Sequence, residues 1–289
     1  MKTSRDSGLI DLRDRSRVES RHPLLIAHRG GVITPSTPEN SLAAIRLAGA
    51  HAYDMVELDV RRAGDGEPVL FHDREGSLLV SCGVNASIPD LAGDELSAIR
   101  YRATDEPIAT LAQGLALCRS LDLGVMLDIK SLGAAPDSEE FVEAVGRLVR
   151  ECDLGGAVLT WNHPLERRHL ADTAMFPLSD EDLGRVTNGR SVSIDGRYWF
   201  GRPHDLTGTI VRALQGSGAL VIAAINTFQY PPHAHTELAR RDVDRLLAAG
   251  IDGFQIDSVY DDLFEGPSLC CELELEIDPP GTRRENTPT

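Results

Sequence analysis

Short apolar runs recur along the chain and alternate with stretches of helical character. This alternation is typical of a parallel β-sheet with crossover helices. Eight such runs in a chain of 289 residues predict an α/β fold, a (β/α)8 TIM barrel, with a doubly wound open sheet as the alternative. The predicted strands are 24–28, 54–60, 124–130, 157–161, 174–178, 191–195, 219–225 and 251–256. The predicted helices are 38–49, 110–121, 138–152, 164–172, 207–216 and 236–250.

The apolar run 68–73 does not fit this alternation. It follows the second predicted strand after only seven residues, RRAGDGE, which is too short for a parallel crossover. Asp65-Gly66 favours a two-residue hairpin turn, so we interpret 68–73 as an antiparallel return outside the barrel. Paired residue numbers then sum to 131, and Asp59 faces His72. The stretch 73–109 follows as a small insertion.

Charge and cysteine content limit the classes of partner. A net charge of −16 argues against nucleic acid or an anionic membrane, which are bound by dense basic patches, but leaves a small phosphorylated molecule open. No run approaches the ~20 apolar residues of a membrane span, and the first residues lack a secretory pattern. The five cysteines are scattered, which indicates free thiols in a reducing compartment. We therefore expect a cytoplasmic protein.

The chain divides into three expected parts. Residues 1–23 form a charged N-terminal extension and 24–268 the barrel, which contains the insertion 73–109. Residues 269–289 form a polar, proline-containing C-terminal tail.

Acidic residues gather at the ends of two predicted strands. Glu57 and Asp59 lie two apart on one strand and point to the same face, as do Asp128 and Lys130 on the next. Carboxylates buried side by side repel each other unless a cation relieves them, and hard oxygen ligands suit Mg²⁺ or Ca²⁺. The pattern therefore predicts one divalent ion on Glu57, Asp59 and Asp128. Salt bridges, for instance with Arg61 on the same face, are the alternative.

Two histidines accompany these carboxylates. His28 ends the first predicted strand, and His72 lies opposite Asp59 in the expected hairpin. A pair of imidazoles beside a phosphate can act as base and acid in one proton relay. Arg29, next to His28, and Lys130 offer positive charge to phosphate oxygens.

The segments HRG, PENS, VELDV, DGEPVLFHD and GIDGFQID resemble glycerophosphodiester phosphodiesterases, a family related to sphingomyelinase D-like and phosphatidylinositol phospholipase C-like barrels. The resemblance runs from about residue 24 to 262. It implies a barrel that binds Ca²⁺ or Mg²⁺ and splits a glycerophosphodiester into glycerol 3-phosphate and an alcohol. By motif, it gives His28 and His72 the acid–base roles, Glu57 and Asp59 the metal, and Arg29 and Lys130 the phosphate.

The chain departs from the family at two places. The third ligand is usually Glu, whereas this chain has Asp128, as in the sphingomyelinase D-like branch, whose products are cyclic phosphates. The seventh strand usually ends in a Trp-containing segment, whereas this chain reads Asn-Thr-Phe-Gln at 226–229. A polar amide at the pocket wall would make glycerophosphocholine a poor substrate, unless aromatics near 198 replace the indole. Candidate pocket residues are Glu39, Asn226, Phe228, Tyr198 and Trp199.

The resulting hypothesis is a metal-dependent phosphodiesterase that hydrolyses a small glycerophosphodiester by His/His acid–base catalysis. The alternative is a lyase or biosynthetic enzyme on the same scaffold that releases a cyclic phosphate or another product. A non-catalytic phosphodiester-binding protein is a third interpretation, disfavoured because a binder needs no proton relay.

Overall fold

The structure is a computed structural model that describes residues 8–72, 77–102, 104–130, 138–190, 192, 194 and 196–264. The tail expected at 269–289, with Cys270 and Cys271, lies outside the described residues. The expected domain boundaries stay predictions.

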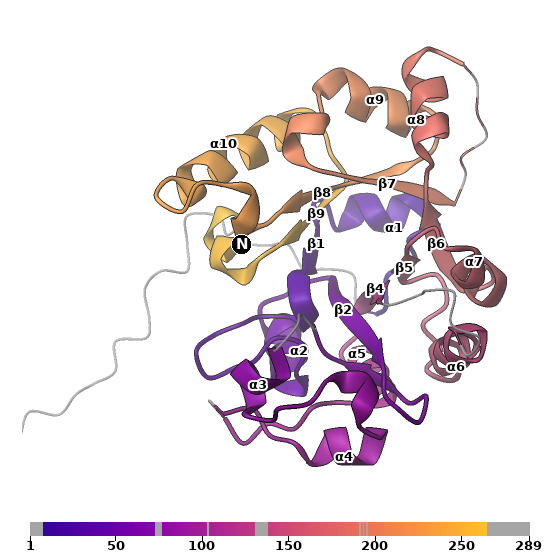
Figure 1. Cartoon of the computed structure of the whole chain (residues 1–289). Coiled ribbons are helices and arrows are strands. Elements are labelled where there is room, and N and C mark those ends of the chain that lie inside the picture. Colours follow the sequence, from indigo (N-terminus) through magenta and orange to yellow (C-terminus); the bar gives the residue numbers. More distant parts are fainter. Residues whose placement is uncertain are drawn as a thin grey trace, which may run out of the picture.

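Eight parallel strands close into a barrel. Neighbouring strands follow the order β1-β9-β8-β7-β6-β5-β4-β2, and a further pairing of β1 with β2 closes the ring. Figure 1 shows these strands in the middle of the molecule, with helices around them. The predicted (β/α)8 barrel is confirmed. The strands are β1 (Leu24–Ala27), β2 (Met55–Arg62), β4 (Gly124–Ile129), β5 (Val158–Thr160), β6 (Ala174–Pro177), β7 (Arg197–Gly201), β8 (Leu220–Ile225) and β9 (Gly253–Ile256).

The sixth predicted strand, 191–195, is wrong. The barrel strand at this place is β7, which starts after the turn at Gly196 (φ +71°) and pairs Tyr198 with Pro177 on one side and Leu220 on the other. The alternating pattern of SVSID is typical of a strand, whereas the strand that the structure has between β6 and β8 begins beyond the glycine, at Arg197. Residues 191, 193 and 195 lie outside the described residues.

The six predicted helices are present with shifted ends. The first predicted helix, 38–49, begins at Leu42 instead of Pro38, because Asn40 has a left-handed φ of 56° and the Ser41 side chain accepts a hydrogen bond from Ala44 N as the N-cap. Four further helices were not predicted. The helices are α1 (Arg15–Ser20), α2 (Leu42–Ala50), α3 (Ser77–Cys82), α4 (Gly93–Ala98), α5 (Leu111–Ser120), α6 (Ser138–Glu151), α7 (Pro164–Leu170), α8 (Asp180–Thr187), α9 (Gly208–Gly216) and α10 (His235–Ala248).

The antiparallel return is confirmed as β3 (Pro68–Leu70), which pairs with β2 at the edge of the sheet and lies outside the barrel. Its predicted register is wrong by one residue: Val60 pairs with Leu70, so paired numbers sum to 130. The turn contains three residues, 64–66, because Gly66 takes a left-handed φ of 93°, as in a hairpin with a glycine bulge. Consequently Phe71, not His72, lies opposite Asp59, and Phe71 N donates to Asp59 O at 3.1 Å.

The insertion has a small core of its own. Helices α3 and α4 pack with the hairpin, and the stacked rings of Phe71 and Tyr101, 6.1 Å apart, lie within this cluster. Its buried members are Ala63, Val69, Phe71, Leu78, Ile88, Leu96, Tyr101 and Ile108.

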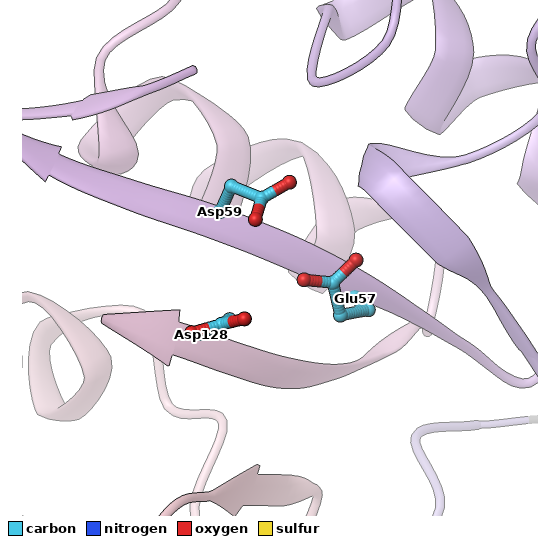
Figure 2. A group of neighbouring side chains, drawn as sticks. All are labelled: Glu57, Asp59 and Asp128. Carbon is cyan, nitrogen blue, oxygen red and sulfur yellow. The ribbon is translucent and has the colours of Figure 1, made fainter. Parts of the chain in front are cut away.

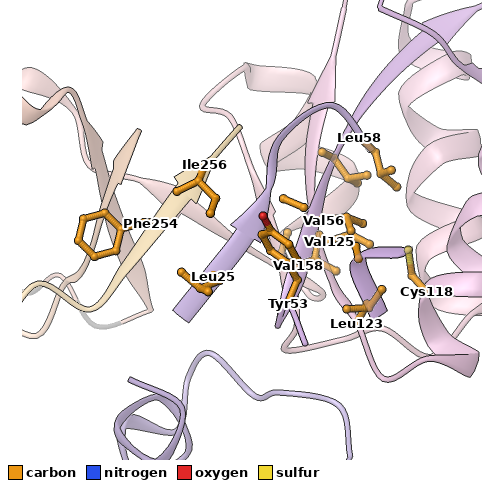
Figure 3. Close-up of a cluster of buried hydrophobic side chains, with 14 of the residues drawn as sticks. Leu25, Tyr53, Val56, Leu58, Cys118, Leu123, Val125, Val158, Phe254 and Ile256 are labelled. Atoms are coloured by element: carbon orange, nitrogen blue, oxygen red, sulfur yellow. The ribbon is translucent and has the colours of Figure 1, made fainter. Parts of the chain in front are cut away.

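The main core lies between the strands and the surrounding helices (Figure 3). A second cluster fills the barrel interior, and Ile10, Leu12 and Val18 join it from the N-terminal segment. Leu12 N donates to Gly156 O, just before β5, and Arg15 forms an ion pair of 2.8 Å with Asp252, just before β9. The segment that includes α1 therefore closes the N-terminal end of the barrel.

The described residues contain neither a membrane-spanning helix nor a disulfide. None of their helices is both long and apolar enough to cross a membrane. Cys82, Cys118 and Cys152 are free thiols.

Candidate active site

His28 and Arg29 lie in a single 3₁₀ turn, His28–Gly30, directly after β1. Arg29 takes a left-handed conformation (φ 53°, ψ 47°), and Gly30 follows with φ +82°. A Cβ at Gly30 would lie 2.5 Å from Asn40 Cα, and one at Gly31 would lie 2.2 Å from Ala44 O. The glycines therefore let this turn press against the start of α2, which fixes where His28 and Arg29 point.

Asp257 orients His28. The β1–β9 register pairs Ala27 with Ile256, so His28 and Asp257 leave the ends of paired strands together, and His28 Nδ1 lies 2.5 Å from Asp257 Oδ1. Burial alone would raise the pKa of Asp257, but the hydrogen bond and charge of His28, with hydrogen bonds from Thr227, lower it to about 2. The ionised Asp257 accepts a hydrogen bond from Nδ1–H of His28. The other ring nitrogen, Nε2, then faces the carboxylates and lies 4.0 Å from Glu57 Oε2.

Three carboxylates converge on neighbouring strands. Glu57 and Asp59 lie on β2, and Asp128 lies on β4, where it is the register partner of Asp59. One oxygen of each carboxylate lies within 4.8 Å of the others (Figure 2). Glu57 and Asp59 are buried. Glu57 Oε2 accepts from Arg29 N at 2.7 Å, and Asn40 Nδ2 donates to Asp59 Oδ2 at 2.8 Å. The Arg29 turn and Asn40 thus hold two of the three carboxylates in place.

The carboxylates carry more negative charge than nearby side chains neutralise. Burial, and then the charges of Asp59 and Asp128, raise the pKa of Glu57 well above its usual value. Burial also raises the pKa of Asp128, against the opposing charge of Lys130. Lys130 Nζ lies 2.9 Å from Asp59 Oδ1 and forms an ion pair with Asp128. One ammonium among three carboxylates leaves room, in charge and in donor type, for a divalent cation.

Glu39 links the second histidine to Arg29. Arg29 Nη1 donates to Glu39 Oε2 at 3.0 Å, and His72 Nδ1 lies 3.7 Å from Glu39 Oε1. Burial lowers the pKa of His72, partly offset by the negative charge of Asp59. His72, two residues beyond the end of β3, is therefore near enough to the cluster for the charge of Asp59 to act on it, although the hairpin register is shifted.

Of the remaining candidate pocket residues, two lie beside His28 and two lie in the core. Asn226 is 2% exposed, and its amide nitrogen lies 3.2 Å from His28 Nδ1, while Phe228 is 64% exposed with its ring 6.5 Å from that of His28. Tyr198 is fully buried in the barrel interior and donates to Thr160 O, so the expectation that it lines the pocket is wrong. Trp199 points to the other side of β7, into the core under the helices.

Sequence reasoning missed three residues at this end of the barrel. Asp257 is one, although its place after a strand that pairs with β1 was a signal for it. Trp161 and Phe200 are the others: they pack edge to face at 5.4 Å beside the interior cluster. Phe200 was hidden by the misplaced sixth strand.

A sequence model of the glycerophosphoryl diester phosphodiesterase family matches residues 28–164. Human glycerophosphodiester phosphodiesterase 1 is 33% identical over 127 residues, which cover 41% of this chain and 36% of that protein. A probable glycerophosphodiester phosphodiesterase 1 of Mycobacterium tuberculosis is 41% identical over 76 residues, 24% of this chain and 27% of its own length. The chain thus spans only about a third of the length of such curated relatives.

Solved structures share the fold. A phosphodiesterase of Oleispira antarctica, in complex with the product sn-glycerol-3-phosphate, superposes with a TM-score of 0.62 at 20% identity, covering 85% of this chain and 98% of that one. A glycerophosphoryl diester phosphodiesterase of Parabacteroides distasonis superposes with a TM-score of 0.64 at 17% identity, covering 88% and 90%.

Proposed function

We propose that the chain is a glycerophosphodiester phosphodiesterase, the family whose sequence model matches residues 28–164, and that it hydrolyses a small glycerophosphodiester to glycerol 3-phosphate and an alcohol. One observation carries the proposal. Three carboxylates cluster at the C-terminal end of the barrel, with His28 Nε2 4.0 Å from Glu57 and with His72 near enough for the charge of Asp59 to act on its pKa. In barrels of this type the C-terminal end is where catalytic groups lie.

Glu57, Asp59 and Asp128 would hold one divalent ion, Mg²⁺ or Ca²⁺. When bound, this ion supplies positive charge to the phosphate oxygens. The buried Nε of Arg29 has no hydrogen-bond partner among the described residues, so it is a donor available to a phosphate oxygen. Lys130 would offer its ammonium from the other side, because it already lies against Asp59 and Asp128.

The histidines would divide the proton transfers. The lowered pKa of His72 favours the neutral imidazole at neutral pH, the form that accepts a proton from the attacking water. Oxygen from that water forms the new bond to phosphorus as the bond to the alcohol oxygen breaks. His28 Nε2, with its ring held by Asp257, donates a proton to the departing oxygen. His72 then releases the proton that it took from water to the solvent, and His28 Nε2 takes one up from the solvent, which restores both side chains.

Asp128 keeps the alternative of a cyclic phosphate open, since it stands where the family usually has Glu. In that reaction the substrate's own neighbouring hydroxyl replaces water as the nucleophile. Phosphorus NMR of the product separates the two, because hydrolysis gives a monoester and the alternative gives a cyclic diester.

The test is release of glycerol 3-phosphate from a panel of glycerophosphodiesters with Mg²⁺, Ca²⁺ or Mn²⁺. We expect turnover that stops on chelation and returns with one of these ions. His72→Gln should be inactive, whereas the control His204→Gln, at an exposed histidine, should match the wild type. Binding of a diester without turnover under every ion would instead support the non-catalytic interpretation.

The free thiols of Cys82, Cys118 and Cys152 support a reducing, cytoplasmic compartment. Fractionation of the cells that make the protein tests this: recovery outside the cytoplasm would contradict it.

A further inference from the structure

Glu39 contacts two of the groups that the proposed function uses. Its Oε2 accepts a hydrogen bond from Arg29 Nη1 at 3.0 Å, and its Oε1 lies 3.7 Å from His72 Nδ1. Among the described residues, Glu39 is the only carboxylate within 4.0 Å of a ring nitrogen of His72. An anion at Nδ1 determines where the neutral imidazole carries its proton, because that nitrogen then has an acceptor and Nε2 has none.

The Glu39 carboxylate is held from two sides. Asn40 N donates to Arg29 O at 2.7 Å, so the main chain of this segment is tied to the turn after β1, as the Glu39 side chain is. From the insertion, the hydroxyl of Tyr101 donates to Glu39 O at 3.3 Å. The ring of Tyr101 also stacks on Phe71, the residue before the second histidine. The turn after β1 and the insertion therefore place this carboxylate and the second histidine relative to each other.

We propose that Glu39 is a positioning residue that fixes the tautomer of His72. Its Oε1 accepts a hydrogen bond from Nδ1–H of the neutral imidazole, which leaves Nε2 without a proton. The inference rests on the proposed function, in which His72 takes a proton from water, because only an unprotonated ring nitrogen accepts one. At 3.7 Å the contact is longer than a direct hydrogen bond, and contacts between catalytic groups commonly tighten in the complex with substrate.

The charges around His72 favour this assignment. Two negative groups, Asp59 and Glu39, and two positive groups, Arg29 and Lys130, act on its ring. Lys130 Nζ lies 2.9 Å from Asp59 Oδ1, so these two charges are engaged with each other. Arg29 is engaged by Oε2 of Glu39, which leaves Oε1 as the oxygen that faces the imidazole.

The first histidine has the same arrangement at shorter range. His28 Nδ1 lies 2.5 Å from Asp257 Oδ1. The two carboxylates come from different parts of the chain, since Asp257 follows β9 and Glu39 precedes α2. With a carboxylate at Nδ1 of each ring, both histidines keep Nε2 for proton transfer.

NMR of the full-length protein with Mg²⁺ and ¹⁵N-labelled histidine measures the tautomer of His72. Long-range proton–nitrogen correlations at about pH 8, above the ordinary pKa of histidine, distinguish Nδ1–H from Nε2–H. His72→Gln identifies the signals by their loss. We expect Nδ1–H in the wild type and a change of the major form to Nε2–H in Glu39→Ala. Glu39→Gln should keep Nδ1–H in part, because its amide oxygen accepts the same hydrogen bond.

Two controls show whether the effect is local. Glu151→Ala, at an exposed glutamate on α6, should leave the signals of His72 unchanged. Asp257→Asn should alter the signals of His28 instead. The Glu39 side chain is 33% exposed, so its removal opens no buried cavity, and melting temperatures check that each variant folds.

Turnover gives a second measurement. The kcat for a glycerophosphodiester should fall about ten- to a hundredfold in Glu39→Ala, the range typical when the partner that orients an active-site histidine is lost. Glu39→Gln should recover part of this loss, which a role in folding alone does not predict.

The outcomes separate the two proposals. The inference is overturned if His72 has the same major tautomer in the wild type and in Glu39→Ala, if the wild type has Nε2–H, or if Glu39→Ala keeps the wild-type kcat. Each of these results leaves the phosphodiesterase function standing. Failure of the wild type to cleave any glycerophosphodiester, with the tautomer change present, overturns the phosphodiesterase function and leaves Glu39 as the residue that orients His72.

Discussion

The two ends of the barrel are built from the same strands but serve different purposes. On β2 the interior positions change from Met55 to Glu57 to Asp59, and on β4 from Met126 to Asp128, within a few residues. At the N-terminal end, Ile10 and Val18 fill the opening with apolar side chains. At the C-terminal end, carboxylates crowd together with raised pKa values.

This difference teaches that stability and chemistry are separated along the strand direction. Burial of apolar surface at the closed end offsets the cost of holding like charges at the open end. Changes at the open end should therefore alter activity more than stability, and changes at the closed end should do the reverse.

The largest expected effect is at the two histidines. His28→Ala and His72→Ala should each lower kcat by about 10²–10⁴-fold, because each removes one partner of the proton relay. Both variants should remain folded. The double variant should lose little more than the worse single variant, since the two groups act as one unit.

Steady-state kinetics with glycerophosphodiesters, together with thermal unfolding, measures both quantities. A single variant with near wild-type kcat would show that its histidine is structural.

At the closed end, Ile10→Ala should lower the free energy of unfolding by about 2–5 kcal/mol, because it leaves a cavity under the barrel. The kcat/KM of this variant should stay within about twofold, on the physical argument that no catalytic side chain touches Ile10. Urea unfolding and kinetics on the same sample test this. The exposed Leu121→Ala is its control. Equal losses of activity and stability would contradict the separation of the two ends.

At the open end, Glu57→Gln should stabilise the metal-free protein by on the order of 1–2 kcal/mol, as relief of a strained functional site commonly does. The amide oxygen can still accept the hydrogen bond from Arg29 N. Wild type should gain about 2.7 kcal/mol from a hundredfold excess of Mg²⁺ over its Kd, and the variant much less.

Thermal unfolding with chelator and with Mg²⁺ measures both effects, with the exposed Glu151→Gln as control. If the melting temperature of the wild type is the same with chelator and with every divalent ion, the result argues against the metal site.

The smallest effect concerns pH. Burial, and then Asp128, raise the pKa of Glu166 to about 7, against a hydrogen bond from His163 N. A carboxyl with a raised pKa in the folded state stabilises below its unfolded pKa, and this contribution is lost as pH rises to 7. Glu166→Gln, which keeps an acceptor for His163 N, should therefore weaken the fall in stability between pH 5 and 8 by on the order of 1–3 kcal/mol. Unfolding in chelator at both pH values tests it, and an unchanged pH profile would contradict it.

The sequence predicted the barrel and the carboxylate cluster because both depend on local patterns. Parallel strands place their C-terminal ends together, so strand ends alone bring Glu57, Asp59 and Asp128 to one edge. Prediction failed where the backbone angle of one glycine determines where a turn ends. The positive φ of Gly66 lengthens the hairpin turn by one residue, and β7 begins only after the turn at Gly196. Asp257 was missed because its role depends on a pairing between the first and last strands, which no local pattern contains.

In the turn after β1, the side chain and the main chain of Arg29 make separate interactions. Its side chain reaches Glu39, whereas its main-chain N–H donates to Glu57. Alanine scanning keeps that N–H and so cannot measure it, and Arg29→Ala would report the guanidinium alone. Only replacement of the amide by an ester, through chemical ligation or nonsense suppression, would reveal how much of the carboxylate cluster depends on the main chain.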